Sequence, residues 1–180
     1  PIEAALYAKK IAPGLRRTFV SEKWRIIGKE LYTDIREEAV SNIDNSIETR
    51  IFASDIDPSA VALARLNAKK AGVDKFISFS VCDAAKAPLF EEKGVIVCNP
   101  PYGERISDKE SVGALYKTIG ERYKALDSWS MYLITSYENA ERDIGKKADK
   151  NRKIYNGMMK TYYYQFMGPK PPKRDRINEN

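Results

Sequence analysis

The tetrapeptide Asn99-Pro100-Pro101-Tyr102 has the clearest chemical capacity in this sequence. It follows an apolar run at residues 94–98 that predicts a short strand. Two consecutive prolines fix their own backbone and carry no N–H donor, so the segment is a rigid turn whose carbonyls accept hydrogen bonds. With the Asn99 amide oxygen, these acceptors suit an –NH₂ group and would aim its lone pair at an electrophile. Tyr102 adds a flat face on which a planar group such as a nucleobase can stack.

A plainer explanation of the tetrapeptide is a proline-rich turn closed by an aromatic side chain. Its position favours function, because open α/β sheets bind ligands beyond the carboxyl ends of their strands. Three other segments follow predicted strands in the same way, at residues 55–57, 82–83 and 135–137.

Carboxylates occupy two of those strand ends. Asp55 closes the apolar run 50–54, and a carboxylate there accepts hydrogen bonds from both hydroxyls of a ribose. Asp83 follows the run 76–81 and either accepts from an adenine amino group or serves as a turn residue. Asp57 precedes Pro58 and is explained by an ordinary role as a helix N-cap, although it also counts as a candidate for binding the same nucleoside. Together these residues predict a nucleoside pocket.

The elements that would position these residues alternate between short buried strands and helices. Strands are expected at residues 50–54, 76–81, 94–98 and 129–135, with helices at 57–71 and 109–125 between them. This order predicts an α/β fold with a doubly wound, mostly parallel sheet. Runs at 153–158 and 161–167 near Asn156-Gly157 predict an antiparallel hairpin at the sheet edge. Two further helices are expected at 1–12 and 21–43.

Composition bounds the chemistry further. With no histidine among 180 residues, Ser-His-Asp triads, Cys-His pairs and histidine metal sites are excluded. Cys82 and Cys98 lie in apolar runs without zinc-site spacing, so reduced thiols in the cytoplasm and no metal are expected. No apolar run approaches the roughly 20 residues that span a bilayer, and no signal peptide is expected. One domain over residues 1–168 and a basic, proline-rich tail over 169–180 are predicted.

The formal charge of +6 favours a polyanionic partner, since each Lys or Arg placed against a phosphate releases a counterion. An ordinary protein of high pI accounts for the charge equally well. A basic cluster favours nucleic acid in the same way and is otherwise a solvated loop; its members are Lys146, Lys147, Lys150, Arg152 and Lys153.

The sequence resembles the THUMP-associated RNA methyltransferases that act on guanine-N2, and most closely the bacterial large-subunit ribosomal RNA enzymes. The resemblance lies in the opening P-I-E-A-A-L-Y-A-K-K-I-A-P-G-L-R-R-T-F, in S-D-I-D-P, in N-P-P-Y-G-E-R and in the late K-K-A-D-K-N-R-K-I-Y-N-G. N-P-P-Y alone is shared with adenine-N6 and glutamine methyltransferases, so it specifies only amine methylation. The opening and late segments single out the RNA family.

This resemblance implies a Rossmann-like class I methyltransferase that uses S-adenosylmethionine. Asp55 would bind the cofactor ribose and Asp83 its adenine, and Asn99 stands on both the cofactor side and the substrate side. Asn99 and the Pro100 carbonyl would hold the target amine, Pro101 would complete the turn, and Tyr102 would stack on the base. The family places a strand and a glycine-rich loop just before the segment that begins here at Pro1, with a THUMP domain upstream. We expect these parts to be absent from this chain.

The expected reaction is methyl transfer to the N2 amine of a guanine in RNA, either 23S ribosomal RNA or a ribosomal precursor. The same chemistry on adenine-N6 in DNA or RNA, or on a protein glutamine, stays open. So does a non-catalytic RNA-binding module of the same fold.

Overall fold

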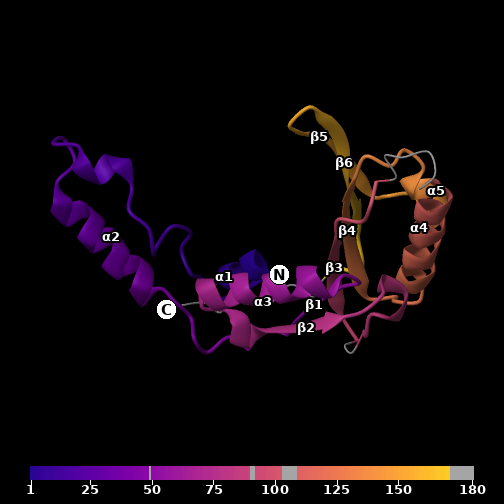
Figure 1. Cartoon of the computed structure of the whole chain (residues 1–180), viewed down its shortest axis with the longest axis horizontal. Coiled ribbons are helices and arrows are strands. Elements are labelled where there is room, and N and C mark those ends of the chain that lie inside the picture. Colours follow the sequence, from indigo (N-terminus) through magenta and orange to yellow (C-terminus); the bar gives the residue numbers. More distant parts are fainter. Residues whose placement is uncertain (49, 90–91, 103–108, 171–180) are drawn as a thin grey trace, which may run out of the picture. The chain divides into compact units, whose positions relative to one another are not determined.

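A computed structural model describes residues 1–48, 50–89, 92–102 and 109–170 of the chain (Figure 1). The chain forms two compact units, Pro1–Asp83 and the part from Ala84 onward, and each has its own sheet and core. The predicted domain over 1–168 and the tail over 169–180 stay predictions, and residues 171–180 of that tail lie outside the described residues.

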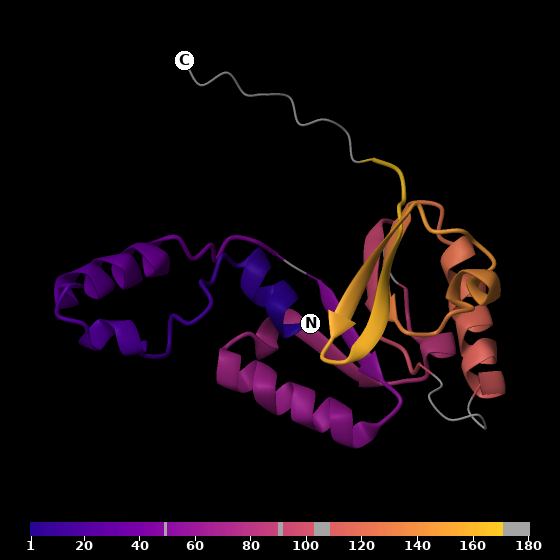
Figure 2. The same ribbon diagram turned by 90° about the horizontal axis from the view of Figure 1, so that it is seen from above.

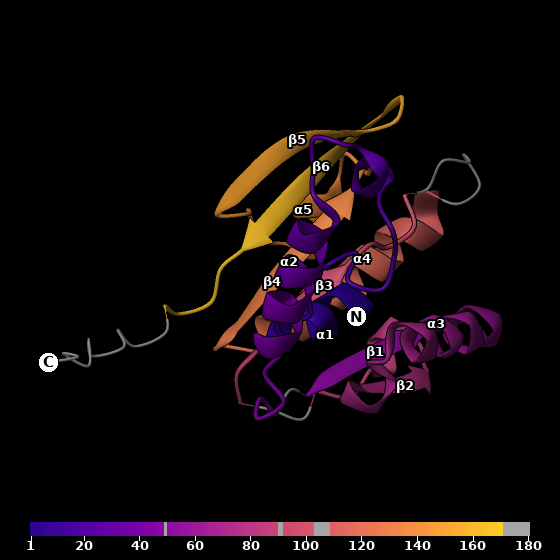
Figure 3. The same ribbon diagram turned by 90° about the vertical axis from the view of Figure 1, so that its left-hand side faces the viewer.

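The first unit has a two-stranded parallel sheet under a long helix. Ile51 pairs with Ile77, and the register continues to Asp55 and Val81 at the far end. Figure 3 shows the helix α3 lying along both strands. Its core holds Ala68 of α3 with Val73 and Ile77. The elements are α1 (Ile2–Ala8), the 3₁₀ turn η1 (Val20–Lys23), α2 (Lys29–Ser41), β1 (Ile51–Asp55), α3 (Pro58–Ala71), η2 (Asp74–Phe76) and β2 (Ile77–Val81).

Local signals at both ends explain why α3 forms where it was predicted. The Asp57 carboxylate accepts a hydrogen bond from the Ser59 backbone N–H at 2.8 Å, and Pro58 occupies the first helical position. At the other end Gly72 adopts a left-handed φ of 75°, which a residue with a Cβ rarely takes. The prediction of a capped helix after β1 is confirmed.

Two helices before β1 are shorter than predicted. The first ends at Ala8 rather than residue 12, because Pro13 disfavours helical backbone in the residue before it and Lys10 already has a φ of 55°. The expected helix 21–43 is interrupted between η1 and α2, where Gly28 is extended with a ψ of 143°. Glycine inside a helix costs about 1 kcal/mol relative to alanine, so the periodic pattern across it was misleading.

The second unit has a mixed four-stranded sheet. Its strand order is β3-β4-β6-β5, with β3 and β4 parallel and the other two pairs antiparallel. β3 and β4 begin and end at the predicted residues. The elements are η3 (Ala84–Lys86), β3 (Gly94–Cys98), α4 (Lys109–Lys124), β4 (Trp129–Thr135), α5 (Ala140–Ile144), β5 (Lys150–Asn156) and β6 (Met159–Phe166).

The core of this unit lies between α4 and one face of the sheet. Residues alternate along β4 between buried and half-buried, so every second side chain faces the helix. The Tyr123 ring on α4 packs against Phe166 on β6, with ring centroids 5.9 Å apart. Figure 2 shows α4 and α5 on the same side of the sheet. The buried side chains on the described part of α4 are Val112, Tyr116, Ile119 and Tyr123.

The predicted hairpin is present as β5 and β6. Asn156 pairs with Met159, so Gly157 is the first residue of a two-residue turn, and its φ of 61° fits that position. β5 begins at Lys150, three residues earlier than expected. The helix α5 was not predicted, because five residues ending at a left-handed Gly145 are too few to show a helical period.

Gly120 allows α4 and α5 to pack closely. A Cβ at this position would overlap the backbone carbonyl of Ile144, which cannot move without shifting α5. We predict that Gly120→Ala lowers the free energy of unfolding by about 1–3 kcal/mol. Gly28→Ala is the control, because a Cβ at Gly28 meets nothing within 4 Å. Urea unfolding measures both, and equal stability of the two variants would contradict the packing argument.

Candidate functional site

Three predicted carboxylates gather at one end of the sheet in the first unit. β1 ends at Asp55, whose backbone carbonyl accepts a hydrogen bond from the Cys82 N–H at 2.9 Å. This bond continues the ladder past the last pair and keeps the two strand ends together. Asp55, Asp57 and Asp83 are all exposed at this edge. The adjacency of these two strands, on which the predicted nucleoside pocket depends, is confirmed.

Two of these carboxylates also hold the local backbone. The Asp57 side chain caps α3, as predicted. Asp55 has a similar task that the sequence did not reveal, since its Oδ1 accepts from the Asp57 N–H at 2.9 Å. Each carboxylate oxygen has two lone pairs, so Asp55 keeps acceptor capacity for ribose hydroxyls. The donor and acceptor chemistry of this edge therefore fits a nucleoside.

The predicted amine-binding turn lies in the second unit, directly after β3. Asn99 is exposed, Pro100 is buried, and Tyr102 is half-buried. The Tyr102 hydroxyl donates to the Asn99 Oδ1 at 2.6 Å, which fixes the amide relative to the aromatic ring. The Gly-Glu-Arg that completes the family-like segment falls at residues 103–105, outside the described residues. The structure thus places the turn in one unit and the carboxylates in the other.

A buried hydroxyl lies under the turn. The Tyr116 hydroxyl lies 3.4 Å from the Pro101 carbonyl, which accepts its hydrogen bond, and 2.5 Å from the Thr135 Oγ1. Burial raises the pKa of the Tyr116 phenol far above its usual value, so the hydroxyl stays protonated as a donor. The Pro101 carbonyl therefore faces the helix α4.

The network continues from Thr135 into the segment after β4. The Tyr137 N–H donates to Thr135 Oγ1 at 2.9 Å, and the Tyr137 hydroxyl donates to Asp143 Oδ2 at 2.5 Å. Arg142 binds the same carboxylate at 3.0 Å, and its hydrogen bond followed by that of Tyr137 lowers the pKa of Asp143. Gly113 leaves room for the pair, since a Cβ there would lie 3.3 Å from both oxygens.

Sequence reasoning found only part of this network. Residues 135–137 were singled out as a strand end without a role, and Tyr116 lies within the helix expected at 109–125, to which no site role was given. Their hydroxyls meet through tertiary packing, which single-sequence periodicity does not encode. A buried stripe that contains tyrosine rather than leucine was the available signal, because a buried phenol needs a hydrogen-bond partner.

Neither cysteine takes part in a disulfide, and burial raises the pKa of the Cys98 thiol. Within the described ranges, His, Cys, Asp and Glu form no group of three or more that could hold a metal ion. In the same part of the chain, no helix combines the length and the apolar character needed to cross a bilayer.

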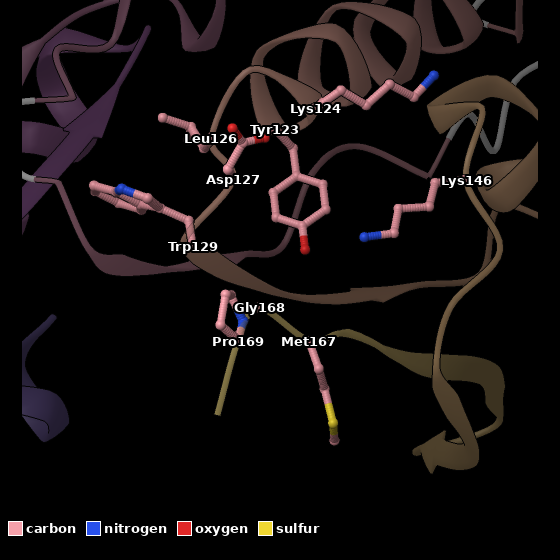
Figure 4. A pocket seen from close by; sticks show the side chains of 9 residues that line it. All are labelled: Tyr123, Lys124, Leu126, Asp127, Trp129, Lys146, Met167, Gly168 and Pro169. Atoms are coloured by element: carbon pink, nitrogen blue, oxygen red, sulfur yellow. The ribbon is translucent and has the colours of Figure 1, made fainter. Parts of the chain in front are cut away.

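A hollow of about 240 Å³ lies at the opposite end of the second sheet from the turn (Figure 4). Trp129, the first residue of β4, lines it, whereas Asn99 follows the last residue of the parallel strand β3. The Lys146 ammonium lies 4.9 Å from the centroid of the Tyr123 ring at its side. This hollow is therefore separate from the predicted amine-binding turn.

Fold and comparisons together define the class of protein. Residues 1–165 match the family described as "UPF0020: RMKL-like, methyltransferase domain". The chain superposes on the crystal structure of SMU.472 complexed with SAH, with a TM-score of 0.89, 37% identity and coverage of 95% of this chain and 45% of that one. SAH is what S-adenosylmethionine becomes after it has given up its methyl group. The class is that of Rossmann-like, S-adenosylmethionine-dependent methyltransferases.

Within that class, the chain belongs to the RMKL-like methyltransferase family. It is 45% identical over 175 residues to the Bacillus subtilis protein named "Putative RNA methyltransferase YpsC", covering 97% of this chain and 46% of that protein. It is 38% identical over 163 residues to ribosomal RNA large subunit methyltransferase K/L of Shewanella baltica, covering 88% of this chain and 23% of that protein. The chain thus spans less than half the length of these relatives.

The hydroxyl network predicts a sharp contrast between two threonine variants. Thr135→Val leaves the buried Tyr116 hydroxyl without its Thr135 partner and the Tyr137 N–H without its acceptor, so we expect a loss of about 1–3 kcal/mol in the free energy of unfolding. Thr118→Val removes only a bond to the Ala114 carbonyl on the exposed side of α4 and should change stability by about 0.5 kcal/mol or less. Urea unfolding followed by tyrosine fluorescence compares them, and similar losses would argue against the network.

Proposed function

We propose that this chain is the catalytic part of an enzyme that methylates the exocyclic N2 amine of a guanine in ribosomal RNA, most specifically 23S RNA or its precursor. The observation that carries the proposal is the exposed Asn99 amide at the end of β3, held by the Tyr102 hydroxyl at 2.6 Å. The names of the two relatives, an RNA methyltransferase and a ribosomal RNA methyltransferase, support RNA as the substrate.

The carboxylates of the first unit hold the cofactor in this proposal. When bound, S-adenosylmethionine supplies a methyl group on a positively charged sulfur, which is already an activated donor and needs no metal. Asp55 accepts hydrogen bonds from the ribose hydroxyls, and Asp83 accepts from the adenine amine. Asp57 supports the same edge through its cap on α3, and Asn99 belongs to the cofactor side as well as to the substrate side.

The turn after β3 positions the acceptor nitrogen. The Asn99 Oδ1 and the Pro100 carbonyl accept from the two N–H groups of the amine, and the Tyr102 ring stacks on the base. The bond from Tyr102 does not block this, because an amide oxygen has two lone pairs. Both acceptors are neutral dipoles fixed before the substrate arrives, so they stabilise the positive charge that develops on nitrogen without reorganising.

No general base is required for this transfer. The amine attacks as a neutral nucleophile and loses its proton to water after the new C–N bond has formed. A chain without histidine can therefore perform it by positioning and electrostatics alone. Ribosomal RNA also implies a cytoplasmic location, since bacteria such as those of the two relatives assemble ribosomes in the cytoplasm.

Nucleoside mass spectrometry tests the proposed substrate. The full-length native protein is incubated with S-adenosylmethionine and ribosomal RNA that lacks modifications, and the RNA is digested to nucleosides. N2-methylguanosine is expected. Methylated adenosine would keep amine methylation and replace guanine by adenine, and the absence of any methylated nucleoside from RNA would reject RNA as the substrate.

Asn99→Ala is expected to lower turnover by about a hundredfold, since it removes one preorganised acceptor from the transition state. Tyr102→Phe keeps the stacking ring and loses only the bond that orients the amide, so its loss should be smaller. Single-turnover rates measure both, and isothermal titration should find unchanged cofactor affinity in the Tyr102 variant. Unchanged turnover in Asn99→Ala would remove this residue from the mechanism.

Asp55→Ala is expected to weaken cofactor binding by at least about tenfold, because a charged acceptor is lost. Asp55→Asn separates the two tasks of this residue, since its amide oxygen keeps the bond to the Asp57 N–H while the carboxylate is gone. Asp74→Ala is a control of equal charge at the other end of β2. Isothermal titration with S-adenosylmethionine compares the three, and wild-type affinity in both Asp55 variants would contradict the assignment.

A further inference from the structure

The hairpin of the second unit extends beyond the strand that it flanks. Tyr162 on β6 pairs with Thr135, the last residue of β4, and β6 runs antiparallel to β4. The first residues of β6 and their partners on β5 therefore lie past the end of β4. This is the sheet edge at which Asn99 follows the parallel strand β3. Figure 1 shows the hairpin, in orange to yellow, projecting beyond β3 and β4.

Four side chains of the hairpin, level with the end of β4 and just past it, alternate between lysine and tyrosine on one face. Lys153 pairs across the strands with Tyr162, and Tyr155 pairs with Lys160. These positions are two apart on each strand, so all four side chains point to the same side. Lys153 lies 5.1 Å from the ring centroid of Tyr155, and Lys160 lies 5.1 Å from that of Tyr162. We call these four residues the hairpin patch.

Three residues of the hairpin patch are exposed, and Tyr162 is half-buried at the border with the core of the second unit. Tyr155 is 62% exposed, whereas Tyr164 on this face is 5% exposed against α4. Both lysines are exposed. Tyr162 raises the pKa of Lys160, and Glu138 does so more weakly, so this ammonium keeps its charge. Lys153 lowers the pKa of the Tyr155 hydroxyl.

Flat aromatic faces next to fixed positive charges match one kind of polymer. Bases of a single strand stack on aromatic rings while lysines contact the phosphates between them. In a duplex the faces of the bases are stacked on one another and are not open to an aromatic side chain. An acidic peptide would use the lysines and leave the rings without a role. The patch also lies at the same sheet edge as the turn that holds the target amine in the proposed function.

We propose that the hairpin patch binds an unpaired stretch of the RNA substrate, with bases stacked on Tyr155 and Tyr162 and phosphates on Lys153 and Lys160. This proposal rests on the proposed function in one respect, namely that RNA is the substrate. It adds that the modified nucleotide lies in or beside a single-stranded segment.

Fluorescence anisotropy with a labelled 12-nucleotide RNA, single-stranded or annealed to its complement, tests the patch in the native protein. We expect tighter binding of the single strand. Tyr155→Leu should weaken it by about tenfold, the loss of one stacked base, while Tyr155→Phe keeps the stacking and the affinity. Lys153→Gln/Lys160→Gln should reduce the slope of log affinity against log salt by about 1.4, which corresponds to two phosphates of a single strand.

A matched control separates local contacts from net charge. Lys69→Gln/Lys70→Gln removes the same charge from the exposed last turn of α3 in the first unit and should leave the salt slope unchanged. In addition, RNA carrying 4-thiouridine should crosslink under ultraviolet light to the peptide that contains Tyr155.

The outcomes distinguish the two proposals. One outcome would overturn the patch and leave RNA as the substrate. In that outcome the wild-type protein binds the RNA, Tyr155→Leu binds it as tightly as Tyr155→Phe, and the two lysine double variants have the same salt slope. If the wild-type protein binds neither RNA at low salt, both proposals fall. Equal affinity for single strand and duplex would overturn the stacking and the unpaired segment.

Discussion

Two buried hydroxyls, those of Tyr116 and Thr135, meet 2.5 Å apart beneath the turn that follows β3. Both residues are fully buried, so neither hydroxyl has water as an alternative partner. Each therefore determines where the other can lie, and with it the position of α4 along β4. The Tyr116 hydroxyl also donates a hydrogen bond to the Pro101 carbonyl, and this bond connects the rigid turn to α4. The exposed Asn99 amide takes its position from this buried contact.

The helix α4 meets three requirements through different residues of one face. Its large side chains pack over β4 and β6 in the core of the second unit. Gly113 leaves room for the Tyr137–Asp143 hydrogen bond, and Gly120 admits the backbone of α5. A helix with leucine and alanine at these positions would have higher helix propensity and could not satisfy the network. In this helix, close packing and the hydrogen bonds of buried polar groups determine the residue types more strongly than helix propensity does.

The parts of the fold that sequence reasoning predicted are those whose signals are local. β3 and β4 are short buried runs between clear breaks, and α3 carries an N-cap, a first-position proline and a terminal glycine within its own segment. Errors arose where local signals conflict or are too short. Gly28 interrupts an otherwise helical pattern, and α5 has only five residues.

The candidate site divides in the same way between local and tertiary information. That Asn99 follows a strand, and that Asp55 and Asp83 end neighbouring ones, could be predicted because the carboxyl ends of parallel strands share an edge. The side chains that contact the turn could not be predicted. Tyr102 bonds to Asn99 and Tyr116 bonds to the Pro101 carbonyl only because of how the side chains pack in the fold. Asp55 shows most clearly what the sequence could not predict. The sequence offered no structural role for its carboxylate, whereas in the fold this carboxylate accepts a hydrogen bond from the Asp57 N–H.

In the proposed function, an amide at Asn99 suits the charge changes of amine methylation. The positive charge moves from sulfur to nitrogen during the transfer. A stabilising group must therefore act at the nitrogen. It must not bind the sulfonium of S-adenosylmethionine more tightly than the methylated nitrogen. A carboxylate would attract both charges and could also retain the departing proton. In that proposal the neutral dipoles of Asn99 and Pro100 would act only at short range, and the Tyr102 hydroxyl keeps the amide oriented. In the proposed function the geometry of the turn therefore matters more than its charge, and the buried Tyr116–Thr135 bond and the Tyr116 bond to the Pro101 carbonyl lie at this turn.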